Sequence, residues 1–181
     1  MSKKYNIIYA DPPWRYKDKG CIGAAEKQYP TMTLEELKKL PVNEIADKDC
    51  VLFMWATYPK MQEALELIKS WGFTYKSIGF QWVKTYKNGK DYFFGLGRWT
   101  RGNTEPCLLA VKGKPKRISA KVGQLIVSPV RKHSTKPYET REKIVQLLGD
   151  LPRIELFARQ KVEGWDSWGN EVECDIDLEE K

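Results

Sequence analysis

A short apolar run that ends in two prolines constrains this chain more than any other feature. Residues 6–10 (Asn-Ile-Ile-Tyr-Ala) are rich in β-branched and aromatic side chains, and Asp11-Pro12-Pro13-Trp14 follows directly. Such a run predicts a short buried strand. Proline has no amide hydrogen and holds φ fixed, so the strand cannot continue through Pro12 and Pro13. Asp11 is therefore expected at the carboxyl end of a strand, where open α/β sheets place their ligand crevices.

The same four residues are suited to holding a planar exocyclic amine. The Asp11 carboxylate can accept one N–H hydrogen bond, and the Pro12 carbonyl, which we expect no strand ladder to use, can accept the second. Trp14 offers an aromatic face for stacking. An ordinary turn after a strand is the alternative interpretation of Asp-Pro-Pro, and the rest of the chain decides between the two.

The remaining apolar runs alternate between strand-like and helix-like patterns. Strands are expected at residues 50–55, 73–84 (as one strand or two), 106–112, 125–130 and 154–158, and helices at 33–40, 57–71 and 137–148. Thr33-Leu-Glu-Glu36 is a capping box, and Thr57 is expected to cap the second helix. The alternation predicts one α/β domain over residues 1–170 with a doubly wound sheet that opens on a parallel βαβ unit. Residues 171–181 are an acidic tail, which we expect to be loose.

The charge is distributed unevenly along the chain. The net charge is +7, but the last eleven residues hold six acidic side chains and one lysine, so residues 1–170 carry 30 basic against 18 acidic side chains, a net +12. Basic residues gather at Arg98 and Arg101, along residues 112–121, and at Arg131-Lys132. This asymmetry favours a polyanionic partner, with a solvated lysine-rich surface as the alternative.

The composition argues against several classes of catalytic site. A single histidine and four dispersed cysteines give no zinc or iron–sulfur pattern, so no metal is expected. There is no nucleophile elbow and no phosphate-binding glycine loop. We expect no membrane span and no secretory signal, and hence a cytoplasmic protein. The chemistry that remains is one that depends on positioning.

Methyl transfer to an amine is such a chemistry. The donor S-adenosylmethionine carries a methyl group that a sulfonium cation has already activated, so an enzyme mainly aligns the reacting atoms. The amine of adenine is a poor nucleophile because its lone pair is delocalised into the ring. Accepting both of its hydrogens, at Asp11 and at the Pro12 carbonyl, would favour a pyramidal nitrogen without a metal or a strong base.

The tetrapeptide belongs to an ordered set of short motifs. The others are Tyr29-Pro-Thr-Met32, Phe53-Met-Trp55, Trp71-Gly-Phe73, Trp82-Val-Lys-Thr85, Asn103-Thr-Glu105, Val111-Lys-Gly113, Lys136-Pro-x-Glu139, Ile154–Arg159, Gly164-Trp165 and Trp168-Gly-Asn-Glu171. Over nearly the whole chain, this set resembles the DPPW (MT-A70-like) adenine-N6 methyltransferases. That family includes the catalytic subunit of the eukaryotic messenger-RNA adenosine methyltransferase and small bacterial and phage enzymes.

The resemblance implies a Rossmann-like methyltransferase fold that is circularly permuted, with the catalytic strand first and the donor strand, residues 154–158, last. It implies S-adenosylmethionine as cofactor and the catalytic set Asp11, Pro12, Pro13 and Trp14. The implied cofactor residues are Asp11, Lys136, Glu155, Phe157, Arg159, Asn170 and Glu171. Lys136 would pair with the methionyl carboxylate of the donor, Phe157 and Arg159 would border the donor, and Asn170 and Glu171 would reach its ribose or adenine. Some relatives have an amide residue where this chain has Glu171. The alternative for Phe157 is a purely structural position in the core, and the alternative for Lys136 is a solvated residue at the start of a helix.

Nucleic acid is the expected substrate, held by the loops 15–31 and 85–101. An adenine within a duplex has to be extruded to reach Asp11, and Tyr16 and Tyr29 could stack on it. Arg98, Arg131 and Lys132 are expected at phosphates, and the basic stretch 112–121 would grip the backbone. The resemblance and the small size favour DNA over RNA. RNA adenine methylation, N4-cytosine methylation and a catalytically inactive nucleic-acid-binding subunit remain alternatives, and monomer or homodimer is left open.

Overall fold

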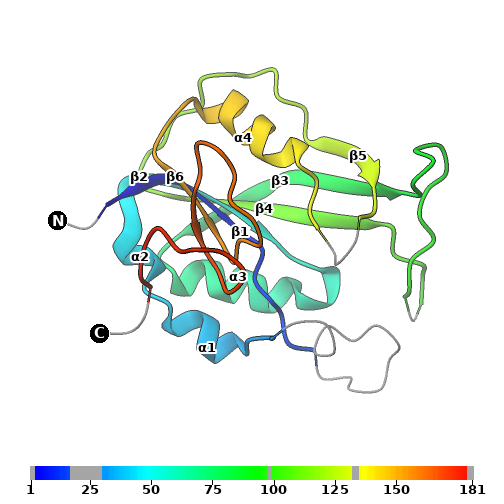
Figure 1. The fold of residues 1–181 in the computed structure, drawn as a ribbon, viewed down its shortest axis with the longest axis horizontal. Helices are drawn as coiled ribbons and strands as arrows, with labels where there is room; N and C mark the ends of the chain where they lie inside the picture. Colours follow the sequence, from blue (N-terminus) through cyan, green and yellow to red (C-terminus); the bar gives the residue numbers. More distant parts are fainter. Residues whose placement is uncertain (1–2, 17–29, 98, 132–134, 179–181) are drawn as a thin grey trace.

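A seven-stranded sheet runs through the molecule, for which a computed structural model describes residues 3–16, 30–97, 99–131 and 135–178 (Figure 1). Its strands are β1 (Tyr5–Ala10), β2 (Ala46–Trp55), β3 (Thr74–Thr85), β4 (Thr104–Lys112), β5 (Leu125–Pro129), β6 (Arg153–Leu156) and β7 (Asp166–Trp168). They lie in the order β5-β3-β4-β2-β1-β6-β7. Strand β4 is antiparallel to both of its neighbours, and the other pairings are parallel. The carboxyl ends of the parallel strands and the amino end of β4 therefore share one edge of the sheet.

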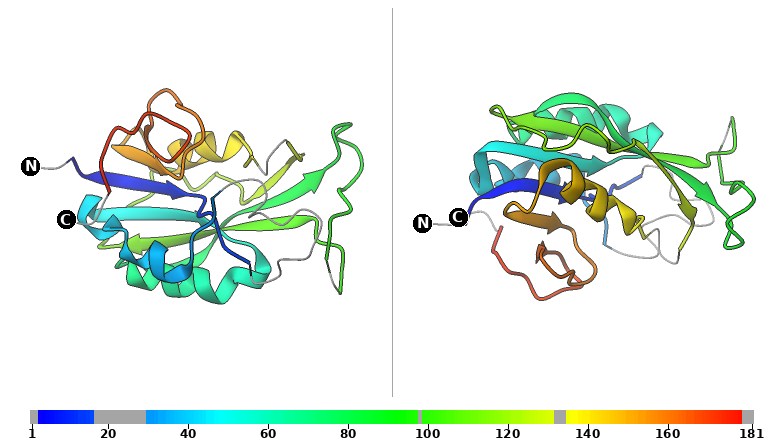
Figure 2. Two further views of the ribbon diagram at one scale, coloured as in Figure 1. Left: turned by 60° about the horizontal axis from the view of Figure 1, so that its bottom comes forward. Right: turned by 90° about the horizontal axis from the view of Figure 1, so that it is seen from above.

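Helices cover both faces of this sheet (Figure 2). They are α1 (Leu34–Lys39), α2 (Val42–Ile45), α3 (Met61–Ser70) and α4 (Glu139–Leu148), with a 3₁₀ turn η2 (Tyr58–Lys60) before α3. Helices α1 and α3 pack on one face and α4 on the other, each over its own core of buried side chains. The predicted α/β doubly wound sheet is confirmed, and its first unit is the expected parallel pair β1–β2.

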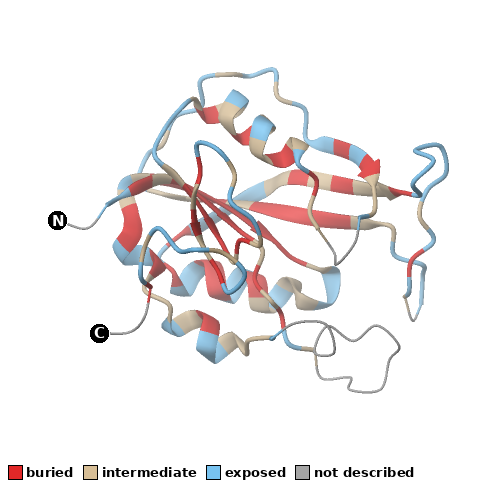
Figure 3. Ribbon diagram, viewed as in Figure 1, coloured by how far each residue is buried: buried red, intermediate tan, exposed pale blue. Residues whose placement is uncertain are grey.

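Strand β1 is buried from both sides (Figure 3). Ile8 and Ala10 belong to the core beneath α1 and α3, whereas Ile7 and Tyr9 belong to the core beneath α4. Alternate side chains of a strand point to opposite faces, so a run without polar residues is what a central strand requires. Asp11, the next residue, therefore lies at the end of a strand in the middle of the sheet.

Local signals in the sequence set the helix ends. The capping box of α1 is formed as predicted: the Thr33 side chain accepts the Glu36 N–H and the Glu36 carboxylate accepts the Thr33 N–H. Gly72 follows α3 with φ of +82°, a conformation that a residue with a side chain rarely adopts. The predicted capping role of Thr57 is wrong, because its side chain makes no cap hydrogen bond. Its hydroxyl instead pairs with the Tyr16 hydroxyl at 2.5 Å.

The last strands differ from the expectation. Strand β6 ends at Leu156, because Phe157 takes a φ of +61° that turns the chain out of the sheet. Strand β7 was not predicted, since Asp-Ser-Trp has no apolar run; it is a short strand that pairs with β6 alone at the edge of the sheet. No helix in the described part of the chain is long and apolar enough to cross a membrane.

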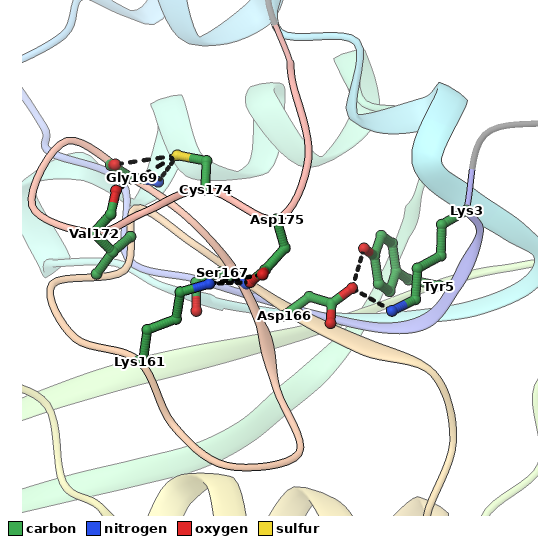
Figure 4. Close-up of polar contacts among 9 residues, drawn as sticks. All are labelled: Lys3, Tyr5, Lys161, Asp166, Ser167, Gly169, Val172, Cys174 and Asp175. Atoms are coloured by element: carbon green, nitrogen blue, oxygen red, sulfur yellow. Dashed lines mark hydrogen bonds and ion pairs between the residues drawn. The ribbon is translucent and has the colours of Figure 1, made fainter.

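The acidic segment after residue 170 is held in place as far as Leu178, so the expectation of a loose tail is wrong there. The Asp175 carboxylate accepts the Ser167 N–H at 2.8 Å and pairs with the Lys161 ammonium (Figure 4). Leu178 is 1% exposed in the core beneath α1 and α3, and Ile176 packs against the same core. Charge dominates the composition of this segment, but its alternate apolar side chains determine where it lies.

Replacing Leu178 with alanine is expected to lower the free energy of unfolding by about 2 kcal/mol, because a fully buried side chain loses its contacts. Urea denaturation monitored by tryptophan fluorescence measures the change. Glu173→Ala, at an exposed position of the same segment, is the matched control and should leave the midpoint unchanged. Equal midpoints for the two variants would mean that the segment adds nothing to stability.

Candidate active site

Four charged side chains meet at the shared edge of the sheet. Asp11 follows β1, Lys84 lies near the end of β3, Glu105 is the second residue of β4 and Lys136 precedes α4. The Lys136 ammonium lies 3.0 Å from the Asp11 carboxylate and 3.0 Å from the Glu105 carboxylate. The second Glu105 oxygen pairs with Lys84 at 2.8 Å. The result is a row of alternating charges, Asp11–Lys136–Glu105–Lys84, which we call the charge row.

The charge row is largely shielded from water. Glu105 and Lys136 have side chains that are 6% and 9% exposed, and Asp11, at the open end, is 25% exposed. The Lys136 ammonium lies 5.8 Å from the centre of the Trp55 ring, and Lys84 lies 4.8 Å from that of Trp82, where the faces of the rings favour a cation. Buried charges are tolerated when each has a partner, and here every charge has one.

The surroundings shift the protonation of these groups in different directions. Burial raises the pKa of Asp11, and Lys136 opposes that shift without cancelling it. Burial also acts to raise the pKa of Glu105, but Lys136 and Lys84 outweigh it and bring that pKa below its ordinary value. Burial would lower the pKa of Lys136, but Asp11 and Glu105 together raise it. Asp11 is thus the carboxylate of the row that takes up a proton most readily.

The turn after β1 differs from the expectation at two residues, Pro12 and Trp14. The Pro12 carbonyl is not unused, because it accepts the Trp14 N–H at 2.9 Å; a carbonyl oxygen has a second lone pair, so one acceptor site remains. Trp14 is 6% exposed and its indole N–H donates to the Trp55 carbonyl at 3.3 Å. The prediction of an open stacking face on Trp14 is therefore wrong: this ring anchors the turn in the core. The Pro13 carbonyl accepts the Met32 N–H at 2.8 Å, which ties the turn to residue 32.

Several of the predicted cofactor residues gather beside Asp11, at the ends of β6 and β7. Ala10 and Leu156 are partners in the sheet, so Phe157 leaves β6 next to the point where Asp11 leaves β1. The Phe157 ring packs edge-on against Trp168, with ring centres 5.4 Å apart. Arg159 follows Phe157 and its positive charge acts on Asp11. Asn170 and Glu171 are exposed just beyond β7, and Arg159 lies 3.9 Å from the Glu171 carboxylate.

Glu155 does not join this group. Both of its carboxylate oxygens accept hydrogen bonds from the Arg141 guanidinium, at 2.6 and 2.7 Å, and the residue is 8% exposed. Arg141 in turn lies over the Tyr9 ring at 5.5 Å. A carboxylate engaged on both oxygens inside the sheet is a tether between α4 and β6, and the contact of Glu155 with a cofactor stays a prediction.

The structure describes only some of the predicted substrate residues. Tyr16 is half-buried beside η2, with the Lys60 ammonium 5.5 Å from its ring centre. Arg131 is exposed and lies over the Tyr138 ring at 4.1 Å. Tyr29, Arg98 and Lys132 lie outside the described residues. The basic stretch 112–121 begins where β4 ends, at the edge of the sheet opposite Asp11, so its first residues do not adjoin the site.

Two members of the charge row, Lys84 and Glu105, were not among the predicted site residues. Both stand in motifs of the ordered set, which is the signal that was available. Nothing in those motifs reveals that Glu105 faces Lys136, since the two come together only because β4 is antiparallel. Among the described residues, no three histidine, cysteine, aspartate or glutamate side chains are grouped so as to hold a metal ion.

Comparisons with known proteins cover nearly the same residues as the ordered motifs. The MT-A70 family model matches residues 5–171. Over 190 residues, the chain is 40% identical to a type II methyltransferase, M.MunI, from Mycoplasma sp, which covers 94% of this chain and 78% of that protein. It is 32% identical over 174 residues to the N(6)-adenosine-methyltransferase catalytic subunit METTL3 of Homo sapiens, and 31% identical over 172 residues to an MT-A70-like N(6)-adenosine-methyltransferase of Arabidopsis thaliana. Those alignments cover 94% and 93% of this chain, but 28% and 24% of the two eukaryotic proteins.

Proposed function

Because this chain belongs to the MT-A70 family of methyltransferases, we propose that it transfers the methyl group of S-adenosylmethionine to the N6 amine of adenine in DNA. The observation that carries the proposal is the Asp11 carboxylate, fixed by Lys136 at the carboxyl edge of the sheet beside the remaining lone pair of the Pro12 carbonyl. Two acceptors on adjacent residues match the two hydrogens of a primary amine.

The proposed chemistry follows from those acceptors. Asp11 and the Pro12 carbonyl would each accept one hydrogen of the amine and hold the nitrogen with its lone pair directed at the methyl carbon. Positive charge would develop on the nitrogen as the new N–C bond forms and the S–C bond of the donor breaks, and the Asp11 carboxylate would stabilise that charge at close range. The methylated amine then loses one proton. Asp11 is an effective acceptor for it because burial raises the pKa of its carboxyl group.

The residues beyond β6 and β7 fit the donor by their chemistry. When bound, the donor supplies a methyl carbon activated by a sulfonium cation. Asn170 and Glu171 are exposed amide and carboxylate groups suited to ribose hydroxyls, and Phe157 offers an aromatic ring that Trp168 holds in place. Lys136, which already bridges Asp11 and Glu105, would meet the methionyl carboxylate from that position.

Replacing Asn170 with alanine is expected to weaken donor binding by about tenfold, which is the loss of one or two hydrogen bonds. Isothermal titration calorimetry with S-adenosylmethionine measures this dissociation constant. Gln160→Ala, at another exposed amide residue between β6 and β7, is the control and should bind as the wild type does. An unchanged dissociation constant for Asn170→Ala would remove Asn170 from the donor site.

The choice of DNA is supported by the 40% identity to a type II methyltransferase that covers most of both chains. The test is to incubate the protein with labelled donor and with single- and double-stranded DNA and RNA, digest the products and identify the modified nucleoside. N6-methyladenine in DNA is the expected product. Label in RNA alone would favour the chemistry named for the eukaryotic relatives, and N4-methylcytosine would contradict the choice of base.

A further inference from the structure

The loop between β3 and β4, residues 86–103, exposes an unusual number of large apolar side chains. Tyr92, Phe94, Leu96 and Trp99 are 65%, 69%, 82% and 95% exposed. The loop projects from the end of the sheet far from the amino terminus, and most of it is exposed (Figures 1 and 3). A soluble chain rarely leaves neighbouring apolar side chains in water without a partner for them.

The loop is built to hold this shape. Asparagine and glycine form a tight turn at its start, where Asn88 accepts the Lys90 N–H at 3.1 Å and Gly89 has a φ of +68°. Further along, the backbone doubles back so closely that a Cβ on Gly95 would lie 2.0 Å from the Gly102 carbonyl oxygen. A Cβ on Gly97 would lie 1.8 Å from the Thr100 carbonyl oxygen. The exposed side chains are thus presented by a folded backbone that tolerates only glycine at these two positions.

The base of the loop is joined to the active site. The Phe93 N–H donates to the Lys84 carbonyl at 2.8 Å, and the Lys84 N–H donates to the Asn103 carbonyl at 2.8 Å. Lys84 stands at one end of the charge row, and Asp11 stands at the other end. The loop therefore leaves the same edge of the sheet that presents Asp11, and both would meet the same partner.

The charge of the loop identifies the kind of partner. Its described residues include the cations Lys87, Lys90 and Arg101 against the single acid Asp91, and the Arg101 guanidinium lies 5.6 Å from the centre of the Phe94 ring. Aromatic side chains mixed with cations suit a polymer with stacked bases and a phosphate backbone. An apolar membrane or protein partner would explain the aromatic side chains but not the attachment of the loop to the charge row.

We propose that Leu96 and Trp99 insert into the base stack of duplex DNA and occupy the space left by the extruded adenine. This inference rests on the proposed function. Asp11 is only partly exposed, so an adenine paired within a duplex cannot bring its amine to the carboxylate without leaving the stack. Extrusion breaks stacking on both sides of the base, and an apolar wedge replaces part of it.

The test compares one DNA sequence in two forms, a duplex and the single strand that contains the target adenine. Trp99→Ala is expected to lower kcat/KM on the duplex by about 10- to 100-fold, the scale of one base–aromatic stack, and by less than about threefold on the single strand, where nothing has to be opened. Leu96→Ala should show a smaller loss of the same kind. Gly97→Ala, which removes no apolar side chain but prevents the close approach to Thr100, should show the duplex-selective loss as well.

The controls separate this inference from the proposed function. Leu125→Ala removes an apolar side chain that is 57% exposed outside the loop, and should leave both rates unchanged. In a duplex that carries 2-aminopurine in place of the target adenine, the fluorescence of this base should increase when the wild type binds. The increase should be smaller with Trp99→Ala, and it does not depend on turnover. Equal losses on both DNA forms, no loss on either, or wild-type activity confined to single strands would each overturn the insertion while the proposed methylation stands. A wild type that methylates no nucleic acid would refute the proposed function itself.

Discussion

Replacing Asp11 with asparagine is expected to lower the rate of methyl transfer by about 10³-fold, the scale seen when one preorganised electrostatic contact to a transition state is lost. Asparagine has the size of aspartate, so the turn at Pro12 and the burial of Trp14 are retained. What is lost is the negative charge that faces the nitrogen as it becomes positive, together with the acceptor for its proton. Donor affinity should stay within about threefold of the wild type, since only one contact near the donor changes.

Single-turnover rates with labelled donor, combined with calorimetric donor binding, separate these two effects. Asp150→Asn is the matched control, because that side chain is 87% exposed at the opposite edge of the sheet. Near-normal turnover in Asp11→Asn would refute the assigned role. A fall in donor affinity as large as the fall in rate would make Asp11 a donor-binding residue instead.

The pH dependence of the wild type provides a second readout of Asp11. Asp11 can stabilise the positive nitrogen by its charge and take up its proton only when the carboxylate is ionised, so the rate falls as pH falls through its pKa. Burial raises that pKa, and the acid limb of the rate is therefore expected at a higher pH than an ordinary aspartate would give. The residual activity of Asp11→Asn should lack this limb.

Most of the fold could be predicted because the signals for strands and the signals for turns lie next to each other in the sequence. The apolar residues 7–10 face two cores, and prolines stop the strand where the sequence indicates. The capping box starts α1 as expected. Strand β7 escaped prediction because an edge strand with one buried face needs no apolar run. The segment 171–178 escaped it because the buried Leu178 and the partly buried Ile176 outweigh several solvated charges.

The site was predicted less completely, for a physical reason. A motif fixes a residue in the chain, but the direction of a strand within the sheet decides which side chains it meets. Glu105 reaches Lys136 because β4 alone runs against its neighbours, and no pattern in residues 104–112 reveals that direction. The buried ring of Trp14 and the tether between Glu155 and Arg141 are likewise tertiary contacts between distant segments.

Lys136 has two roles that one variant can separate. Lys136→Met removes the cation between the buried Glu105 and the partly exposed Asp11, and breaking such a pair is expected to lower the free energy of unfolding by about 3 kcal/mol. Lys136 opposes the upward shift of the pKa of Asp11, so its removal should move the acid limb of the rate to still higher pH. Chemical denaturation and a pH–rate profile measure the two effects.

Glu105→Gln should shift the acid limb in the opposite direction. It tests the role of the charge row even if Lys136→Met folds poorly. The negative charge of Glu105 contributes to the raised pKa of Asp11, so glutamine at this position should move the acid limb to lower pH. Shifts of opposite sign in the two variants would establish that the charge row sets the ionisation of Asp11. If Lys136 only holds the methionyl carboxylate of the donor, Lys136→Met would weaken donor binding and leave the limb in place, and Glu105→Gln would not move it either. The position of one acid limb in these two variants thus decides whether Lys136 acts on the catalytic carboxylate or on the donor alone.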